Sequence, residues 1–314
     1  MKRFFLLLLI FSLMVSFFGC STNPAGAEKT LFAMDTVMNL SVWGDEGEAV
    51  LSHLSTLLQD LETVWSPTDE SSVLCALNRG QAVSLTAEQS ALLARLQSLS
   101  DRTGGAFDPK LGALIDAWGF LSDDPRVPAQ VQIDEALTQP KWDLGGALKG
   151  YAGVLAVEYL QKTNISHAIL NLGGNIQTYG TKPDGKSWQI GIQNPDGGDP
   201  IGIICVDGTA AVVTSGDYRR YFEQDGTRYH HILDPKTGYP AASGLRAVTI
   251  ICADGLLADV LSTALFVMGL EEATAFYRQS CDFEAVFVLQ DGTIYATEGA
   301  RLFGCKYEVI SREN

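Results

Sequence analysis

Asp-Gly pairs punctuate the second half of the chain, where they separate short apolar runs. An Asp-Gly pair readily takes the positive φ angles of the two-residue turns that join neighbouring antiparallel strands. We expect hairpins over Asp225-Gly226 and Asp291-Gly292, and further turns at Asp184-Gly185 and Asp207-Gly208. Helices are interspersed irregularly among these strands. The pattern therefore favours an α+β fold with mixed or antiparallel sheets over a doubly wound parallel sheet.

The spacing of apolar residues predicts the individual elements. Apolar residues recur at helical spacing between Glu46 and Val64, which predicts a core helix. The sequence Thr86-Ala87-Glu88-Gln89 is a capping box and predicts the start of a second helix. Two further helices are expected, one ending near Gln161 and one over 255–268. Strands are expected over 34–42, 168–175, 188–192, 201–213 with an interruption, 245–252, and 283–297 as a hairpin.

The first twenty residues have the order of a bacterial lipoprotein signal peptide. Lys2-Arg3 is followed by the apolar run Phe4–Phe18, which is short for a membrane-spanning helix, and then by Gly19-Cys20. We predict cleavage, a lipid on Cys20, and a domain facing the extracytoplasmic side of the cell membrane. An ordinary cleaved signal and an uncleaved anchor are the alternatives. The predicted divisions are a signal peptide over 1–20, a polar linker over 21–29 and one domain over 30–314.

The formal net charge of −15 limits the classes of ligand. An acidic chain of this size is a poor candidate for binding the phosphate backbone of a nucleic acid, so we expect no nucleic-acid partner. It also repels an anionic nucleotide. A phosphate-bearing substrate would therefore require local cations or a metal ion.

The cysteine pattern argues for neither a metal site nor a disulfide framework. Five cysteines remain besides Cys20, which is an odd number, and no pair has the spacing of metal ligands. We interpret them mainly as small buried apolar residues, with one disulfide possible in an exported protein. They are Cys75, Cys205, Cys252, Cys281 and Cys305.

Two adjacent histidines stand out in the stretch 214–240, which contains a predicted hairpin and the turn 234–238. Adjacent strand residues point to opposite faces, so at most one of His230 and His231 can face a given pocket. Histidine is the natural general base near neutral pH. From composition alone, a catalytic histidine and a decorated surface hairpin remain equally open.

Two further stretches offer phosphate and metal chemistry. In 143–151 a Gly-Gly turn leads into a helix, whose free N–H groups and Lys149 could reach a phosphate. Asp143 could also simply cap that helix. In the helix 255–268, Asp259, Ser262 and Thr263 share one face, and oxygen donors of this kind suit Mg²⁺. The alternative is a core helix that tolerates a few polar residues.

The stretch 214–240 resembles the signature of the ApbE family, the flavin transferases. Four other stretches, 103–120, 143–151, 168–175 and 258–266, resemble the same family in the same order. Together the matches span about 30–300. The resemblance implies a T-fold-like α+β architecture. It also implies transfer of FMN from FAD to a Ser or Thr hydroxyl of an acceptor protein, with Mg²⁺ required and AMP released.

The resemblance also implies roles for individual residues. His231 would be the catalytic base. The metal ligands would be Asp259, Thr263 and the backbone carbonyl of Gly146. The chain departs from the family at Asp35, where glycine is usual, and at Thr68, where an aromatic residue often stands and Trp65 could substitute. Contacts to FAD would come from Met34, Thr68, Ala106, Phe107, Asp108, Asp143, Lys149 and Ile232.

Two other functions remain open at this point. The same site could hydrolyse FAD to FMN and AMP, with water replacing the protein hydroxyl. A flavin-binding lipoprotein without turnover is the second alternative, and the presence of Asp259, Thr263 and His231 argues against it.

Overall fold

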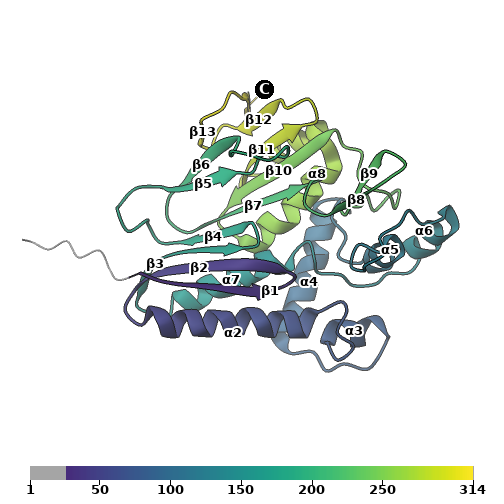
Figure 1. Ribbon diagram of the computed structural model, residues 1–314, viewed down its shortest axis with the longest axis horizontal. Helices are drawn as coiled ribbons and strands as arrows, with labels where there is room; N and C mark the ends of the chain where they lie inside the picture. Colours follow the sequence, from purple (N-terminus) through teal and green to yellow (C-terminus); the bar gives the residue numbers. More distant parts are fainter. Residues whose placement is uncertain (1–25, 314) are drawn as a thin grey trace, which may run out of the picture.

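The computed structural model describes residues 26–313, which are arranged around one large sheet (Figure 1). The helices are α2 (Gly47–Trp65), α3 (Val73–Asn78), α4 (Ala87–Arg102), α5 (Gly112–Trp118), α6 (Gln130–Leu137), α7 (Leu148–Leu160) and α8 (Gly255–Arg278). The strands are β1 (Gly26–Ala33), β2 (Thr36–Gly44), β3 (Ile165–Leu172), β4 (Asn175–Tyr179), β5 (Trp188–Ile192), β6 (Gly202–Val206), β7 (Ala210–Gly216), β8 (Tyr221–Gln224), β9 (Thr227–His230), β10 (Leu245–Cys252), β11 (Glu284–Leu289), β12 (Ile294–Thr297), β13 (Leu302–Phe303) and β14 (Glu308–Ile310).

The large sheet has nine strands in the order β1-β2-β3-β4-β7-β10-β11-β12-β14. All neighbouring pairs are antiparallel except β12 and β14, which are parallel. This confirms the predicted α+β class. The neighbours β4 and β7 are separated in sequence by β5 and β6, so the chain leaves the sheet and returns.

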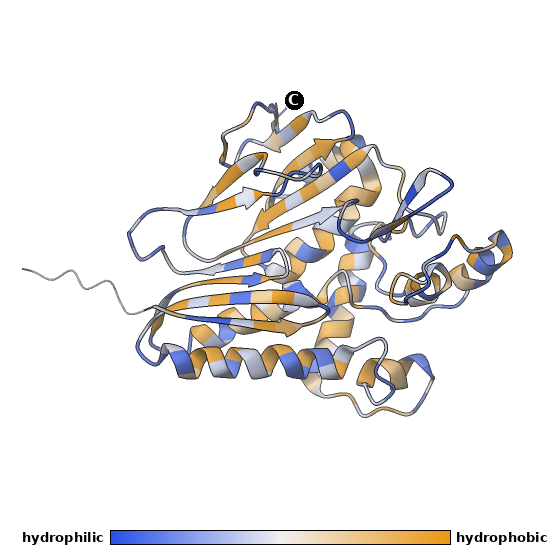
Figure 2. Cartoon of the chain, viewed as in Figure 1, coloured by the Kyte–Doolittle hydropathy of each residue, from blue (hydrophilic) through white to orange (hydrophobic). Residues whose placement is uncertain are grey.

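Helices cover one face of this sheet and bury the main core. α8 packs on β7 and β10, α7 packs on α8 and β4, and α2 lies along β1 and β2. Figure 2 shows hydrophobic residues along α8 and the central strands. Their apolar side chains fill a single cluster that includes Met38, Leu170, Val248 and Phe266, each fully buried. This packed core fixes the positions of α8 and of the central strands relative to each other.

A small second sheet, β13-β6-β5, covers part of the other face. Trp188, Ile190 and Ile204 from this sheet pack against Val212 and Val286 of the large sheet. A third apolar cluster lies beside the large sheet, where α5 and α6 meet the β8–β9 hairpin (Figure 1). Its centre is the fully buried Trp118, so the hairpin is held by aromatic packing and not by the sheet.

Most predicted elements are confirmed. The helix over 46–64 is α2, the capping box at Thr86 and Gln89 is formed, and α8 has a kink at Gly269, just after the predicted end. Strands β5 and β10 have the predicted bounds. The hairpin turn at Asp225-Gly226 has positive φ at both residues, as its sequence requires.

Two of the four Asp-Gly pairs do not close hairpins. Asp184-Gly185 joins β4 to β5, and Asp207-Gly208 joins β6 to β7, and in both cases the two strands belong to different sheets. The run 201–213 is therefore two strands of separate sheets and not one interrupted strand. A tight turn determines only the local reversal of the chain. The sheet to which the next strand pairs depends on packing between distant segments.

The start of the domain also differs from the prediction. The first strand, β1, begins at Gly26, inside the segment 21–29 that was expected to be a linker. It is an edge strand whose polar residues face outward, so its composition resembles that of a tether. Met34 and Asp35 do not belong to the following strand. Both have positive φ and form the tight turn between β1 and β2.

The interpretation of the cysteines holds only in part. The five cysteines of the described region are free, and of these only Cys252 is buried, whereas Cys281 is exposed. Across residues 26–313 no helix has the length and apolar character needed to cross a bilayer. The predicted signal peptide and the lipid on Cys20 lie outside the described residues.

Candidate functional site

A cleft of about 990 Å³ opens between the β1–β2 turn, the α5–α6 region and the segment leading to β8. Every residue to which the family resemblance gives a role lines this one cleft. The predicted roles of these residues remain predictions. The lining residues fall within 32–36, 62–68, 106–108, 111–125, 143–149, 173–175, 214–222 and 231–233, with Asp259 and Thr263 from α8.

The contact between α7 and α8 fixes the position of Asp259. A Cβ atom on Gly150 would collide with the carbonyl oxygen of Gly255, so the two helices touch backbone to backbone. At this crossing the N–H of Gly150 donates to Oδ2 of Asp259 at 2.8 Å. Asp259 is only 5% exposed but still lines the cleft, so one side of its carboxylate is held while the other is available to a ligand.

A network of hydroxyl groups lies beside Asp259. Oγ of Ser215 lies 2.8 Å from Oγ of Ser262 and 3.3 Å from Oγ1 of Thr263. Ser262 is fully buried, and its hydroxyl donates to the backbone carbonyl of Asp259 at 2.8 Å. The expectation that Ser262 offers an oxygen to the metal is therefore wrong. Ser215, from the end of β7, lines the cleft in its place.

The residues at this point fit a small hard cation. A Cβ atom placed on Gly146 would lie 3.6 Å from Oγ1 of Thr263, so the backbone of Gly146 lies against the hydroxyl network. The donors that line the cleft here are the Asp259 carboxylate and the Thr263 hydroxyl. In the part of the chain that the structure describes, no group of three or more His, Cys, Asp or Glu residues is placed to hold a metal. A site with one carboxylate suits Mg²⁺, which keeps water and substrate phosphate as its other ligands.

Asp143, in the turn before α7, does not cap that helix, contrary to one interpretation of the sequence. The helix begins at Leu148 with Ala147 as its N-cap, so Asp143 is not the cap. Instead, Oδ1 of Asp143 accepts from the N–H of Gly145 at 2.9 Å, which shapes the Gly-Gly turn. Burial raises the pKa of the Asp143 carboxyl, and the hydrogen bond from Gly145 opposes this effect.

His231 lies just beyond the end of β9, with its ring in the cleft. Its Nδ1 is 3.0 Å from the backbone carbonyl of Arg220, and its own N–H donates to the same carbonyl at 3.1 Å. Because a carbonyl only accepts, Nδ1 must carry the proton, which leaves Nε2 as an unprotonated base. Burial lowers the pKa of His231 to about 4, with the Arg220 carbonyl acting in the opposite sense.

His230 lies outside the cleft, as the alternation of strand side chains predicts. It is 8% exposed, its ring packs edge-on against Phe266, and its Nδ1 accepts from the N–H of Ile232 at 3.3 Å. His230 is therefore a structural residue that holds the segment leading to His231. We therefore expect replacement of His230 to disturb the packing of this segment.

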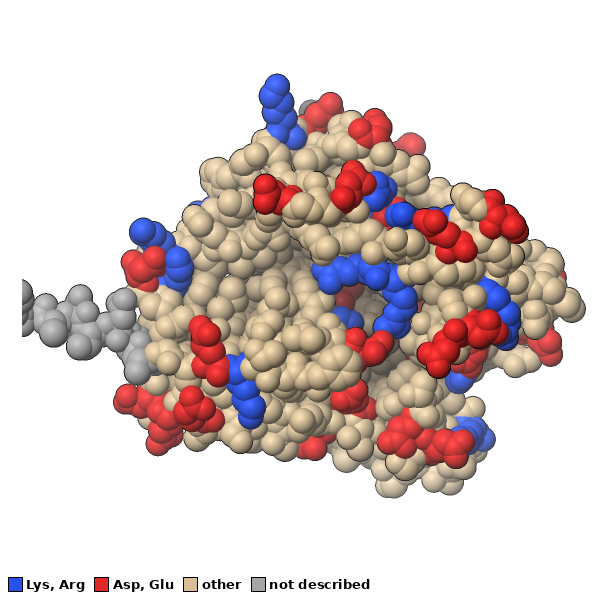
Figure 3. All heavy atoms as spheres, viewed as in Figure 1, with Lys and Arg blue, Asp and Glu red and all other residues tan. Residues whose placement is uncertain are grey.

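Basic side chains provide the local positive charge that an anionic substrate would require. Figure 3 shows Lys and Arg side chains gathered across the hollow in the middle of this face. The basic residues among those lining the cleft are Lys149, Arg219 and Arg220. Arg220 is paired with Asp35 of the β1–β2 turn. The sequence pattern indicated Lys149 but neither arginine, although both lie within three residues of the small-residue turn 214–217.

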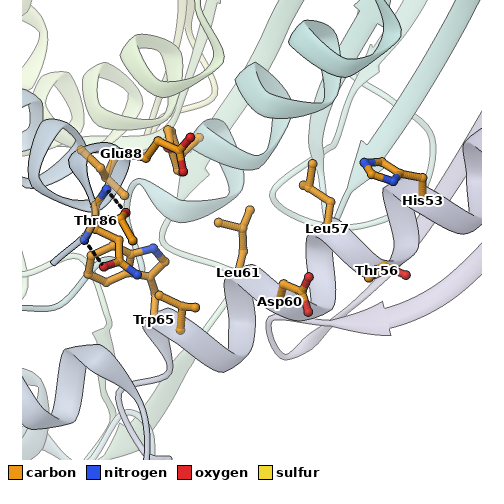
Figure 4. Close-up of a pocket in the computed structure, with 12 residues that line it drawn as sticks. His53, Thr56, Leu57, Asp60, Leu61, Trp65, Thr86 and Glu88 are labelled. Carbon is orange, nitrogen blue, oxygen red and sulfur yellow. Dashed lines mark hydrogen bonds between the residues drawn. The ribbon is translucent and has the colours of Figure 1, made fainter. Parts of the chain in front are cut away.

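A second, smaller cavity of about 360 Å³ lies between α2 and α4 (Figure 4). Its walls are mainly apolar, with Leu57 and Leu61 from α2 and the capping residue Thr86 at the start of α4. Apart from Trp65, none of the predicted site residues lines it. Trp65 lines both this cavity and the cleft. It is almost fully buried and also belongs to the main core.

Comparisons with known proteins identify related sequences and a related structure. The sequence model of the ApbE family matches residues 34–287. A Treponema pallidum protein named FAD:protein FMN transferase is 34% identical over 292 residues, 81% of each chain. A Klebsiella pneumoniae protein of the same name is 37% identical, over 63% of this chain and 67% of its own. The crystal structure of the ApbE protein from Thermotoga maritima superposes with a TM-score of 0.82 at 33% identity, covering 87% of this chain and 97% of that one.

Proposed function

The chain belongs to the ApbE family, and on that basis we propose that it is an FAD:protein FMN transferase. The reaction joins the FMN half of FAD to a Ser or Thr hydroxyl of an acceptor protein. The acceptor oxygen forms a bond to the FMN phosphorus, the bond from that phosphorus to the bridging oxygen breaks, and AMP leaves with the bridging oxygen.

The observation that carries the proposal is the meeting of a base and an oxygen cluster in one cleft. His231 enters from the end of β9, whereas Asp259 and Thr263 enter from α8, and all three line the same cavity. Phosphoryl transfer needs a base at the nucleophile and charge stabilisation at the phosphate, held in fixed positions. A cavity of about 990 Å³ is at the upper end of the range for nucleotide-sized ligands.

His231 would act through Nε2. The Arg220 carbonyl holds the proton on Nδ1 and fixes the plane of the ring. Nε2 can then accept the proton from the acceptor hydroxyl as that oxygen attacks. The lowered pKa of His231 keeps the ring neutral at pH 7 and thus ready to accept a proton.

Asp259, Thr263 and the carbonyl of Gly146 would hold the Mg²⁺ ion that the family resemblance implies. When bound, this ion would neutralise charge on the pyrophosphate as AMP leaves. The hydrogen bond from Gly150 keeps the Asp259 carboxylate aimed at this point. The cations Lys149 and Arg219 support binding of a polyanion to a chain whose net charge is −15.

We also propose that the enzyme is a lipoprotein. The motif that ends in Gly19-Cys20 supports this, because it would place a lipid on Cys20. β1 begins at Gly26, so a fully extended connection could reach no more than about 20 Å. The domain would then work close to the outer surface of the membrane, on acceptors that are found there.

The test is a product assay. The protein is incubated with FAD and Mg²⁺, with and without an acceptor protein, and both AMP and protein-bound flavin are measured. The proposal predicts that AMP and protein-bound flavin rise together and that both need the acceptor. AMP release without labelled acceptor would instead identify an FAD diphosphatase.

A further inference from the structure

One buried polar group in the cleft has no partner. Asn175, the first residue of β4, is 6% exposed, and its Nδ2 makes no hydrogen bond to any atom of the described chain. Asn175 nevertheless lines the cleft. Buried amide groups are nearly always paired, so an unpaired donor at a cleft wall indicates a ligand that accepts its hydrogen bond.

The position of Asn175 shows which part of the cleft it serves. Alternate residues on a strand share a face, and Gln177, two residues further along β4, packs against Gly153 of α7 and Gly255 of α8. The Asn175 side chain is therefore on the side of the sheet that faces these two helices. The oxygen cluster around Asp259 lies on the same side, so Asn175 and this cluster line the same cleft from one side of the sheet.

A cation lies at the same corner. The guanidinium of Arg219 packs directly over Gly174, and its Nη1 donates to the carbonyl of Gly173 at 3.3 Å. A side chain on Gly174 would collide with it, so the glycine pair makes room for the arginine. Unlike Arg220, Arg219 forms no ion pair within the described residues. An unpaired donor next to an unpaired cation makes a binding corner for an anion.

We propose that Asn175 and Arg219 form a phosphate-binding corner, in which Nδ2 of Asn175 donates to a non-bridging oxygen of the FAD pyrophosphate. The inference rests on the proposed function, because it takes FAD as the ligand. Asn175 would then be a substrate-binding residue that acts on the same pyrophosphate as the metal ligands of α8. Arg219 supplies long-range attraction and a second set of donors.

The test compares ligands that differ in phosphate. Binding of FAD and of riboflavin to the purified full-length protein is followed by flavin fluorescence, with Mg²⁺ and with EDTA. Asn175→Ala should weaken FAD binding about 10- to 100-fold, the usual worth of a hydrogen bond to a charged group. Riboflavin binding should stay within twofold of the wild type. Asn175→Asp should weaken FAD binding at least as much, because it replaces a donor by a negative charge.

A substitution of Arg219 gives a second test of FAD binding. It does not alter a buried side chain, so it carries less risk of unfolding the protein than a substitution of Asn175. Arg219→Gln should weaken FAD binding several-fold, and the loss should shrink as salt is added. Arg228→Gln is the matched control, since Arg228 is an arginine of the neighbouring β8–β9 hairpin that pairs with Glu223 outside the cleft. Its FAD affinity should equal that of the wild type.

Two results would overturn the inference: FAD binding by Asn175→Ala within twofold of the wild type, or equal losses for FAD and riboflavin. Melting temperatures identify any variant that fails to fold, in which case the Arg219 comparison decides. The wild-type transfer assay is run alongside. If the wild type binds FAD but transfers no FMN, the proposed function fails, while the binding comparison still decides the role of Asn175.

Discussion

His231 is the side chain whose chemistry is most sharply defined by its contacts. His231→Ala should slow FMN transfer by roughly 10²- to 10⁴-fold, which is the typical contribution of a positioned acid–base group. FAD affinity should change little, because the ring is aimed at the acceptor hydroxyl. Single-turnover transfer and FAD binding measure the two effects separately.

The control for this variant is His53→Ala. His53 is an exposed histidine of α2 that stacks on Tyr159 and lines only the second cavity, so its removal should leave transfer unchanged. His230 cannot serve as the control, because it is buried against Phe266. A rate loss in His231→Ala that is fully explained by weaker FAD binding would refute the assignment of His231 as base.

The pKa of His231 determines the pH dependence. An unperturbed histidine would lose activity as the pH falls through about 6.5. Burial lowers the pKa of His231 to about 4, so the ring stays neutral and able to accept a proton down to that pH. We therefore expect kcat/KM of the wild type to be flat from pH 8 to about 5.5 and to fall as the pH approaches 4. A half-maximal value near pH 6.5 would contradict this account.

Asp259 provides the only negative charge in the proposed metal site. Asp259→Asn should abolish Mg²⁺-dependent turnover, because the remaining neutral oxygens cannot offset the dehydration of Mg²⁺. The amide oxygen can still accept the hydrogen bond from Gly150, so the fold should be kept. Turnover is measured against Mg²⁺ concentration, and the melting temperature checks the fold. Wild-type rates at low Mg²⁺ would show that Asp259 has only a structural role.

The crossing of α7 and α8 places Asp259 beside the Gly-Gly turn. Gly150→Ala should lower both stability and activity, because its methyl group would meet the Gly255 carbonyl and the Cβ of Asp259, a contact with rigid backbone. Such overpacking costs about 1–3 kcal/mol, more than alanine gains in helix propensity. The observables are the free energy of unfolding and the transfer rate.

Gly153→Ala is the matched control on the same helix. Its methyl group would meet the Gln177 side chain, at 3.0 Å from Oε1 and 3.6 Å from Cβ and Cγ, which is a milder contact than the one Gly150→Ala makes with the Gly255 carbonyl. We expect a smaller loss of stability than for Gly150→Ala. If both alanine variants behave alike, the close approach of the two helices does not position the site.

Local signals in the sequence were enough to predict four of the helices, α2, α4, α7 and α8, and two of the hairpins. The capping box at Thr86 and the stripe of α2 are properties of a few neighbouring residues, so they could be read directly. The destination of the strands after Asp184-Gly185 and Asp207-Gly208 could not, because it depends on packing between distant segments. The edge strand β1 was missed because its outward-facing polar residues resemble those of a linker.

The same distinction holds within the site. Helical spacing predicted that Asp259 and Thr263 share a face of the helix, and both line the cleft, but it could not show that the Ser262 hydroxyl bonds to the Asp259 carbonyl and to Ser215. Ser215 takes its place because β7 happens to run beside α8. A role for Asn175 could not have been predicted from the sequence. The role is inferred from the buried amide nitrogen, which has no hydrogen-bond partner within the described chain.

The attachment of the whole molecule to the membrane is tested at Cys20. Cys20→Ser removes the thiol that would carry the lipid, so the variant should be released in soluble form or remain unprocessed. Membrane fractionation and the intact mass of the purified protein report the outcome. If both are unchanged relative to the wild type, the chain is not anchored through this residue.

The central claim is that the cleft joins FMN to a hydroxyl of another protein. The most direct test is mass spectrometry of an acceptor protein after incubation with the enzyme, FAD and Mg²⁺. We predict an acceptor that gains one FMN on a single Ser or Thr through a phosphoester bond, together with one equivalent of AMP, and no gain when Asp259→Asn replaces the wild type. An acceptor left unmodified while FAD is bound or hydrolysed would contradict the account.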